Sequence, residues 1–153
     1  MRTVLISLAA AVAVASPAFA NEGRVEARGG IVWDSGASEA TAGLAAGYDW
    51  DLGSSAFAGL EVSGDKILDA GSNRVSFGFT GRAGVKASAD DKLFATVGYS
   101  TKNCNFCDDA VHAGAGYEHS FGSMYGKVEY RHFFTSNGSS DFDAVAVGVG
   151  LKF

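Results

Sequence analysis

Proline is almost absent from this chain, which contains one, Pro17, among 153 residues. Proline removes a backbone donor from a sheet, so every residue after Pro17 can take part in a ladder of strands. The chain also has 21 glycines, and each glycine inside a helix costs about 1 kcal/mol relative to alanine. Long helices are therefore disfavoured, and the composition predicts an all-β protein.

A long apolar run is missing as well, apart from one at the start of the chain. Residues 1–20, MRTVLISLAAAVAVASPAFA, have a basic residue at Arg2, an apolar stretch and a small-residue AFA site that ends at Ala20. The apolar stretch is shorter than the roughly 20 residues that a spanning helix needs, so we interpret it as a cleaved signal peptide rather than an anchor. The remaining residues, 21–153, are expected to form one domain.

An excess of positive charge is also absent. Beyond Arg2 the chain has 11 lysines and arginines against 17 aspartates and glutamates. No basic stripe is present, so a nucleic-acid partner is excluded. We expect no cofactor and no metal.

The rest of the chain is dominated by alternation of apolar and polar residues with a period of two. This period indicates strands, and turn signals separate the runs. Eight strands are predicted, at residues 23–34, 40–51, 55–65, 74–87, 92–102, 109–120, 124–135 and 142–153.

The two faces of these strands differ in chemistry. One face is aliphatic and aromatic, and the pattern predicts that it carries no charge inside the strands. The other face carries the charges and most of the glycines. An eight-stranded barrel has an interior just wide enough for side chains to fill, and small residues with a few long paired ones suit that space. The glycine and charge face is therefore predicted to line the lumen, and the apolar face to contact lipid.

Aromatic residues on the apolar face gather toward the two ends of the strands, as expected of girdles at two membrane interfaces. The girdle residues are Trp33, Tyr48, Trp50, Tyr99, Tyr117, Phe134 and Phe153. The fold predicted is thus an eight-stranded antiparallel up-and-down transmembrane β-barrel. An even number of strands leaves both chain ends on the periplasmic side.

A resemblance to a known family rests on the signal peptide, the eight alternating runs, the segment VEYRHF at 128–133 and the ending GVGLKF. With these features the chain resembles the small outer-membrane barrels of the OmpA, OmpX and opacity-protein type. The resemblance implies a place in the outer membrane of a Gram-negative bacterium, in contact with lipid and lipopolysaccharide, as a monomer. It also implies that the outer-membrane assembly machinery reads Phe153 and the alternation before it.

Charges on the lumenal face are close to balanced in sign, which predicts a paired network, because a buried unpaired ion costs several kcal/mol. The predicted network consists of Arg24, Glu26, Arg28, Glu61, Arg82, Lys86, Glu118, Lys127, Glu129 and Arg131. We interpret it as a packed lumen in a barrel with a structural or surface-interaction role. A small-solute pore is the alternative.

Cys104 and Cys107 form a C-x-x-C pair in the third outer loop. Redox catalysis or half of a metal site is one interpretation of this spacing. An exported protein reaches an oxidising compartment, so we favour a local disulfide.

Histidines offer three candidate sites. His119 and Ser120 are consecutive strand residues and point to opposite faces. His112 falls on the lumenal face, where we expect a hydrogen-bonding role. The segment RHFFTSN is similar to the His-x-Ser-Asn segment of lipid A deacylases of the PagL type, with His132 on the lipid face. Phe134 stands where that pattern has serine, and Ser136 falls in a loop, so no enzyme activity is predicted.

Overall fold

The computed structural model describes residues 21–68, 74–102, 108–135 and 140–153. The predicted signal peptide, residues 1–20, and the predicted Cys104–Cys107 disulfide lie outside the described residues. In the part of the chain that is described, no helix is both long and apolar enough to cross a membrane.

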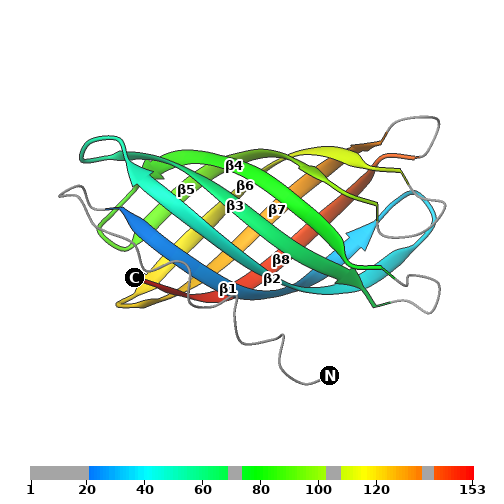
Figure 1. The fold of residues 1–153 in the computed structure, drawn as a ribbon, viewed down its shortest axis with the longest axis horizontal. Helices are drawn as coiled ribbons and strands as arrows, with labels where there is room; N and C mark the ends of the chain where they lie inside the picture. Colours follow the sequence, from blue (N-terminus) through cyan, green and yellow to red (C-terminus); the bar gives the residue numbers. More distant parts are fainter. Residues whose placement is uncertain (1–20, 69–73, 103–107, 136–139) are drawn as a thin grey trace, which may run out of the picture.

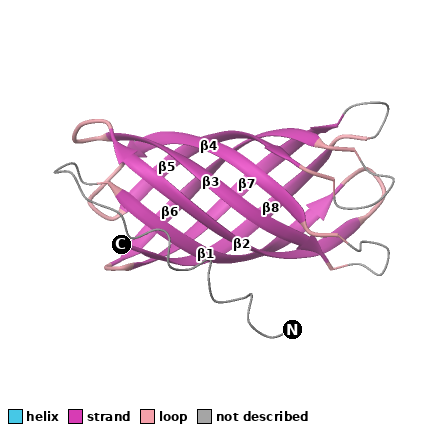
Figure 2. Ribbon diagram, in the orientation of Figure 1, coloured by secondary structure: helices cyan, strands magenta, loops and turns pink. Residues whose placement is uncertain are grey.

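Eight antiparallel strands, each hydrogen-bonded to the next and the last to the first, close into a single barrel (Figures 1 and 2). The strands are β1 (Glu22–Trp33), β2 (Ser38–Asp51), β3 (Ala56–Ile67), β4 (Ser76–Lys86), β5 (Asp91–Ser100), β6 (Ala110–Phe121), β7 (Met124–Thr135) and β8 (Phe142–Lys152). The predicted all-β barrel of eight strands is confirmed, and no predicted boundary is more than two residues from the observed one.

The barrel closes where β1 meets β8. The Gly23 amide donates to the Phe153 carbonyl over 2.8 Å, and the Phe153 amide donates to the Gly23 carbonyl over 2.9 Å. Residue 21 and Phe153 therefore lie at the same end of the barrel, which we call the terminal end (Figure 1). The opposite end, where residues 34–37 join β1 to β2, is called the loop end.

Connections at the terminal end are short. Residues 122–123 join β6 to β7 in a two-residue hairpin, and Gly122 there has φ +71°. Gly53, between β2 and β3, has φ +88°. Glycine suits both positions because other residues rarely adopt positive φ.

The two faces of the wall are those expected from the alternation. Large apolar side chains are exposed on the outside, with Leu44 at 67% and Phe79 and Val97 at 60%. The buried residues are mainly polar or charged and point into the barrel, among them Arg24, Glu61 and Glu118. The lumen is therefore a polar core, and the outer wall is apolar.

The expectation that the apolar face carries no charge is wrong at the strand ends. Asp143, Asp91 and Lys66 share the parity of the exposed apolar residues on β8, β5 and β3. Asp143 accepts a hydrogen bond from the Tyr130 hydroxyl, and Asp91 accepts one from the Tyr117 hydroxyl, both over 2.5 Å. These charges lie at the ends of strands and the two acids have donors beside them, which lowers the cost of placing them on the apolar face.

Candidate functional site: the lumen and its vestibule

The centre of the lumen is organised around Glu61 on β3. Arg24 Nη1 lies 2.8 Å and Arg28 Nη1 2.9 Å from its carboxylate. From the opposite side of the barrel, Arg131 Nη2 approaches to 3.0 Å and Lys127 Nζ to 3.4 Å. Since β1 and β7 supply these cations in pairs, one acid joins three strands across the lumen.

Two further acids complete this central cluster. Glu129 accepts from Arg131 Nε over 2.5 Å and lies 3.3 Å from Lys127 Nζ. Glu26 lies 2.8 Å from Lys127 Nζ and accepts from the Tyr125 hydroxyl over 3.0 Å. The side chains of this cluster are almost entirely buried, so the ion pairs act in a medium of low dielectric, where attraction and desolvation are both large.

A second cluster fills the lumen toward the terminal end. Arg82 lies 2.7 Å from Asp49 and 3.0 Å from Glu118, and Lys92 lies within 3.4 Å of both acids. The Arg82 guanidinium also sits over the rings of Phe57 and Phe94, 5.0 and 4.7 Å from their centroids. Such stacking is favourable for a desolvated cation.

Lumenal aromatic residues were not predicted from the sequence. Phe57, Phe94 and Tyr125 are buried inside the barrel, with at most 5% of their surface exposed. Room for these rings comes from glycines, because a Cβ at Gly116 would collide with the Phe94 ring and one at Gly150 with the Tyr125 ring. Each of the three residues lies on the lumenal parity of its strand, and this parity was the signal available in the sequence.

All residues of the predicted network point into the lumen, and each makes an ion pair in the structure. Lys86 stands apart from the two clusters and pairs with Asp51 over 2.6 Å. The prediction missed several partners on the same parity, which are Glu22, Asp49, Asp51, Asp65, Lys92 and Lys152.

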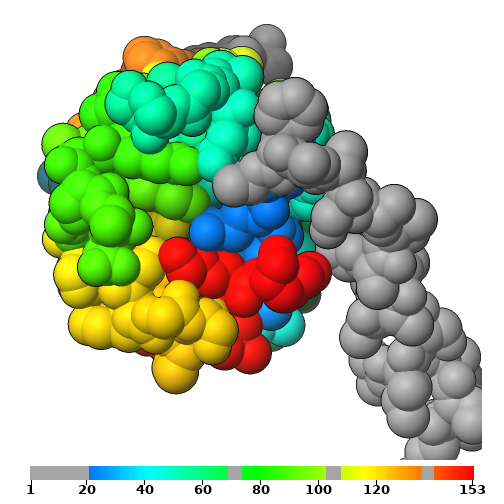
Figure 3. Space-filling model, turned by 90° about the vertical axis from the view of Figure 1, so that its left-hand side faces the viewer, coloured from blue at the N-terminus to red at the C-terminus, as the bar shows by residue number. Residues whose placement is uncertain are grey.

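Charged side chains of the described residues gather at the terminal end of the lumen. Figure 3 looks onto this end, and described side chains fill the part of the rim that the view leaves uncovered. Lys92 pairs with Glu22 over 2.6 Å, and Lys152 lies 3.4 Å from the same carboxylate. Ion-paired side chains of the described residues therefore continue from the second cluster to this rim.

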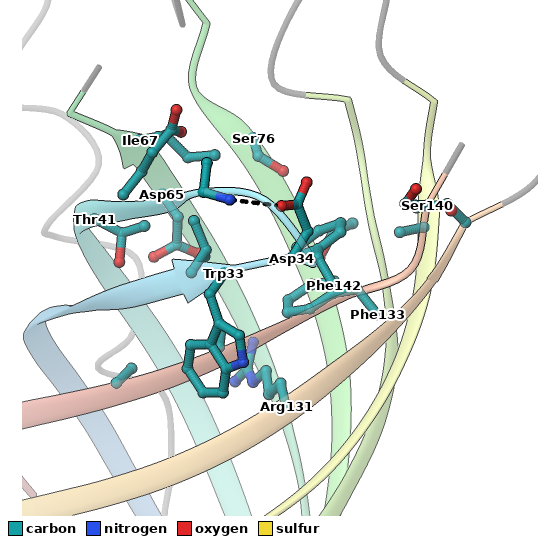
Figure 4. Close-up of a pocket in the computed structure, with 18 of the residues that line it drawn as sticks. Trp33, Asp34, Thr41, Asp65, Ile67, Ser76, Arg131, Phe133, Ser140 and Phe142 are labelled. Atoms are coloured by element: carbon teal, nitrogen blue, oxygen red, sulfur yellow. Dashed lines mark hydrogen bonds between the residues drawn. The ribbon is translucent and has the colours of Figure 1, made fainter.

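At the loop end the lumen widens into a cavity of about 460 Å³, which we call the vestibule (Figure 4). Arg28, Asp65, Glu129 and Arg131 form its charged floor. Phe133 and Phe142 stack in parallel on one side, with centroids 4.4 Å apart. A volume of this size is typical of small-molecule sites.

His112 is fully buried next to the vestibule. Its Nε2 lies 3.0 Å from the Thr80 hydroxyl and its Nδ1 3.2 Å from the Ser100 hydroxyl. Both ring nitrogens are therefore engaged with hydroxyl groups, as expected from the parity of this residue. Within the described ranges no group of three or more His, Cys, Asp or Glu residues is placed to hold a metal ion.

On the outer wall, His132 lies beside Asp143 with its Nδ1 2.7 Å from the carboxylate. Phe134 packs edge-on against the imidazole, with centroids 4.6 Å apart. Ser136 lies outside the described residues. His119 makes the same kind of contact with Asp91, over 2.7 Å, whereas Ser120 points inward and accepts from Lys152.

The predicted girdle residues lie toward the two ends of the outer wall. Trp50, Tyr99, Tyr117, Phe134 and Phe153 are exposed, and Trp33 and Tyr48 are half-buried. Trp33, Tyr99 and Phe134 lie toward the loop end, and the other four toward the terminal end.

No known protein family and no curated protein matches this chain. Solved structures do match. Neisserial surface protein A aligns with a TM-score of 0.61 at 9% identity, over 86% of this chain and 95% of its own. Ail, the attachment invasion locus protein of Yersinia pestis, solved with the heparin analogue sucrose octasulfate, aligns with a TM-score of 0.58 at 11% identity, over 87% and 98%.

The outer-membrane enzyme PagL aligns with a TM-score of 0.57 at 15% identity, over 84% of this chain and 98% of its own. At such low identities the likeness concerns the fold alone. The chain has the fold of the small eight-stranded outer-membrane β-barrels.

Proposed function

We propose that this protein is a monomeric outer-membrane barrel with a closed lumen and a role in envelope structure or surface interaction. Its apolar wall would contact lipid and lipopolysaccharide, with the aromatic girdles at the two interfaces. The outer membrane of a Gram-negative bacterium is the location that this fold favours. Phe153, at the closing seam, is the residue proposed to be read by the assembly machinery.

The cross-lumen ion network is the observation that carries the proposal. Glu61 is contacted by cations from both sides of the barrel. Toward the terminal end, Arg82 and the two rings it stacks on occupy the lumen. A porin lumen is a water-filled channel. Here side chains fill the corresponding space, which favours a structural barrel over a pore.

Single-channel recording in planar bilayers tests the closed lumen. The refolded protein is expected to give no steady conductance steps on the nanosiemens scale. Arg82→Ala serves as the comparison, since it removes the guanidinium that bridges Asp49 and Glu118. Steady open steps from the unmodified protein would replace the structural role with the pore.

A lipid A-modifying enzyme is the second candidate, favoured by the His132–Asp143 contact on the outer wall and by the structural likeness to PagL. Phe134 occupies the serine position of the sequence pattern, and a nucleophile must lie within hydrogen-bond reach of its base. We therefore propose a non-catalytic role. Loss of ester-linked acyl chains from lipid A on expression, abolished in His132→Ala, would establish the enzyme instead.

A further inference from the structure

We infer that the vestibule is a binding site for a small zwitterion, such as a short peptide, that carries an ammonium group, a carboxylate and an apolar group. This inference gives a ligand class to the proposed surface-interaction role and rests on it.

A cationic anchor lies on the vestibule floor. Arg131 is nine-tenths buried, and its Nε and Nη2 are held by Glu129 and Glu61. The remaining nitrogen, Nη1, donates to no acceptor in the described part of the chain, although the residue lines the vestibule (Figure 4). A guanidinium held on one edge and free on the other suits a ligand carboxylate.

An anionic anchor lies on the wall across from it. Glu39 on β2 lines the vestibule, and it makes no hydrogen bond or ion pair within the described ranges. The other lining acids are engaged: Asp65 and Glu129 pair with Arg28 and Arg131, Asp34 accepts from the amides of Gly36 and Ala37, and Asp108 also has an interaction partner. Glu39 is therefore the carboxylate available to an ammonium group.

The two anchors occupy the same row of the barrel. Arg131 pairs with Ala144, Ala144 with Val32, and Val32 with Glu39 across successive strands. Three strand spacings separate Arg131 from Glu39, or about 14 Å along the wall. Both residues share the lumenal parity, so their side chains shorten this gap to one that a small zwitterion can span.

An apolar surface lies directly above this row. Phe133 follows Arg131 by two residues on the same face of β7 and stacks on Phe142 of β8. The stacked rings line the vestibule and offer a surface to an apolar side chain. A bare metal ion or a simple anion would use only part of this arrangement.

Tryptophan fluorescence gives a direct binding test. Trp33 lines the vestibule, and the second tryptophan, Trp50, lies near the other end of the barrel. Trp50→Phe therefore leaves one reporter at the site. Titration of this variant in detergent micelles with glycyl-leucine is expected to give a saturable change in Trp33 emission.

Blocked forms of the same dipeptide identify the anchors. N-acetylation removes the ammonium and C-amidation removes the carboxylate charge, and each is expected to weaken binding about tenfold. Glu39→Gln should reduce the affinity for the free dipeptide to that for the acetylated one. Phe142→Leu should weaken all three forms and keep their order.

Three results would overturn the inference: no saturable change, equal affinities for the free and blocked forms, or an unchanged preference for the free amine in Glu39→Gln. Circular dichroism of each variant controls for folding. The conductance of the barrel does not enter this test, so failure here leaves the closed-lumen proposal standing.

Discussion

At the scale of single residues, the lumen is built by matching glycines to large side chains. A Cβ at Gly47 would lie 2.7 Å from Arg24 Nη2, and one at Gly116 would lie 2.7 Å from the Val128 carbonyl and collide with the Phe94 ring. A Cβ atom does not come this close to a non-bonded neighbour, so the facing side chain or the strand would have to move. The lumenal glycines thus set how closely side chains can fill the barrel.

Gly116→Ala is expected to lower the free energy of unfolding by about 1–3 kcal/mol, the usual cost of overpacking a core. Gly81→Ala is the matched control, because a Cβ there faces outward and meets nothing closer than 3.7 Å. Denaturant unfolding in micelles measures both. Equal effects of the two substitutions would contradict the matching of Gly116 to Phe94.

Asp34 lies outside the strands, in the turn between β1 and β2, and its titration can be followed there. Its carboxylate accepts from the amides of Gly36 over 2.8 Å and Ala37 over 3.0 Å, and these bonds lower its pKa below the ordinary value. A lowered pKa stabilises the folded turn above the ordinary pKa of aspartate, about 3.9. That contribution is lost as the pH falls through the folded pKa.

The amide proton shifts of Gly36 and Ala37 are accordingly expected to titrate with a midpoint below about 3.9. Two-dimensional NMR in micelles, between neutral pH and pH 2, measures the midpoint. Asp34→Asn should abolish the titration of both amides. A midpoint above the ordinary value would show that the turn does not hold the carboxylate as described.

At the scale of the strand, consecutive residues face different surroundings, the outside of the wall and the packed lumen. On β5, Val97 is 60% exposed on the outer wall, whereas Thr96 is 6% exposed and donates to Glu129 in the lumen. In vesicles, a fluorophore on Val97→Cys is expected to be quenched by lipid-soluble quenchers and one on Thr96→Cys to be shielded. The reverse order would exchange the two faces of every strand, because the side-chain period is two.

The same two-residue period explains which features of these strands can be predicted from the sequence. Val145, Val147 and Val149 are separated by small residues, and this alternation is a local property that fixes both the strand and its outer face. Asp143 shares that parity, contrary to the expectation that the apolar face carries no charge inside the strands. Its position depends on the Tyr130 hydroxyl and His132 across the strand pair, which the parity of one strand does not reveal.

The pairing inside the lumen is less accessible to sequence analysis. Arg24 meets Glu61, which is 37 residues away and two strands on, and Lys92 meets Glu22 from 70 residues away. These pairs depend on the stagger of strands around the closed barrel. The sequence therefore identifies which charges lie inside but leaves open which acid each base contacts.

At the scale of the whole molecule, the central cluster ties together strands that the sheet hydrogen bonds do not join. Glu61 on β3 connects β1 and β7 through four cations. Each of those cations also forms an ion pair with a second acid, for example Arg131 with Glu129 and Lys127 with Glu26. Removal of Glu61 would thus leave excess positive charge at the centre of the lumen without leaving any one cation wholly unpaired.

Glu61→Gln preserves the shape of the side chain and removes only its charge. It is expected to lower the free energy of unfolding by about 3 kcal/mol, since breaking a buried ion pair leaves an uncompensated charge in a medium of low dielectric. Glu39→Gln is the matched control, because this acid makes no ion pair within the described strands, and its effect should stay within about 0.5 kcal/mol. Denaturant unfolding of both variants in the same micelles gives the comparison. A Glu61→Gln barrel as stable as the Glu39→Gln barrel would show that aromatic packing and sheet hydrogen bonds hold the lumen closed without the central charges.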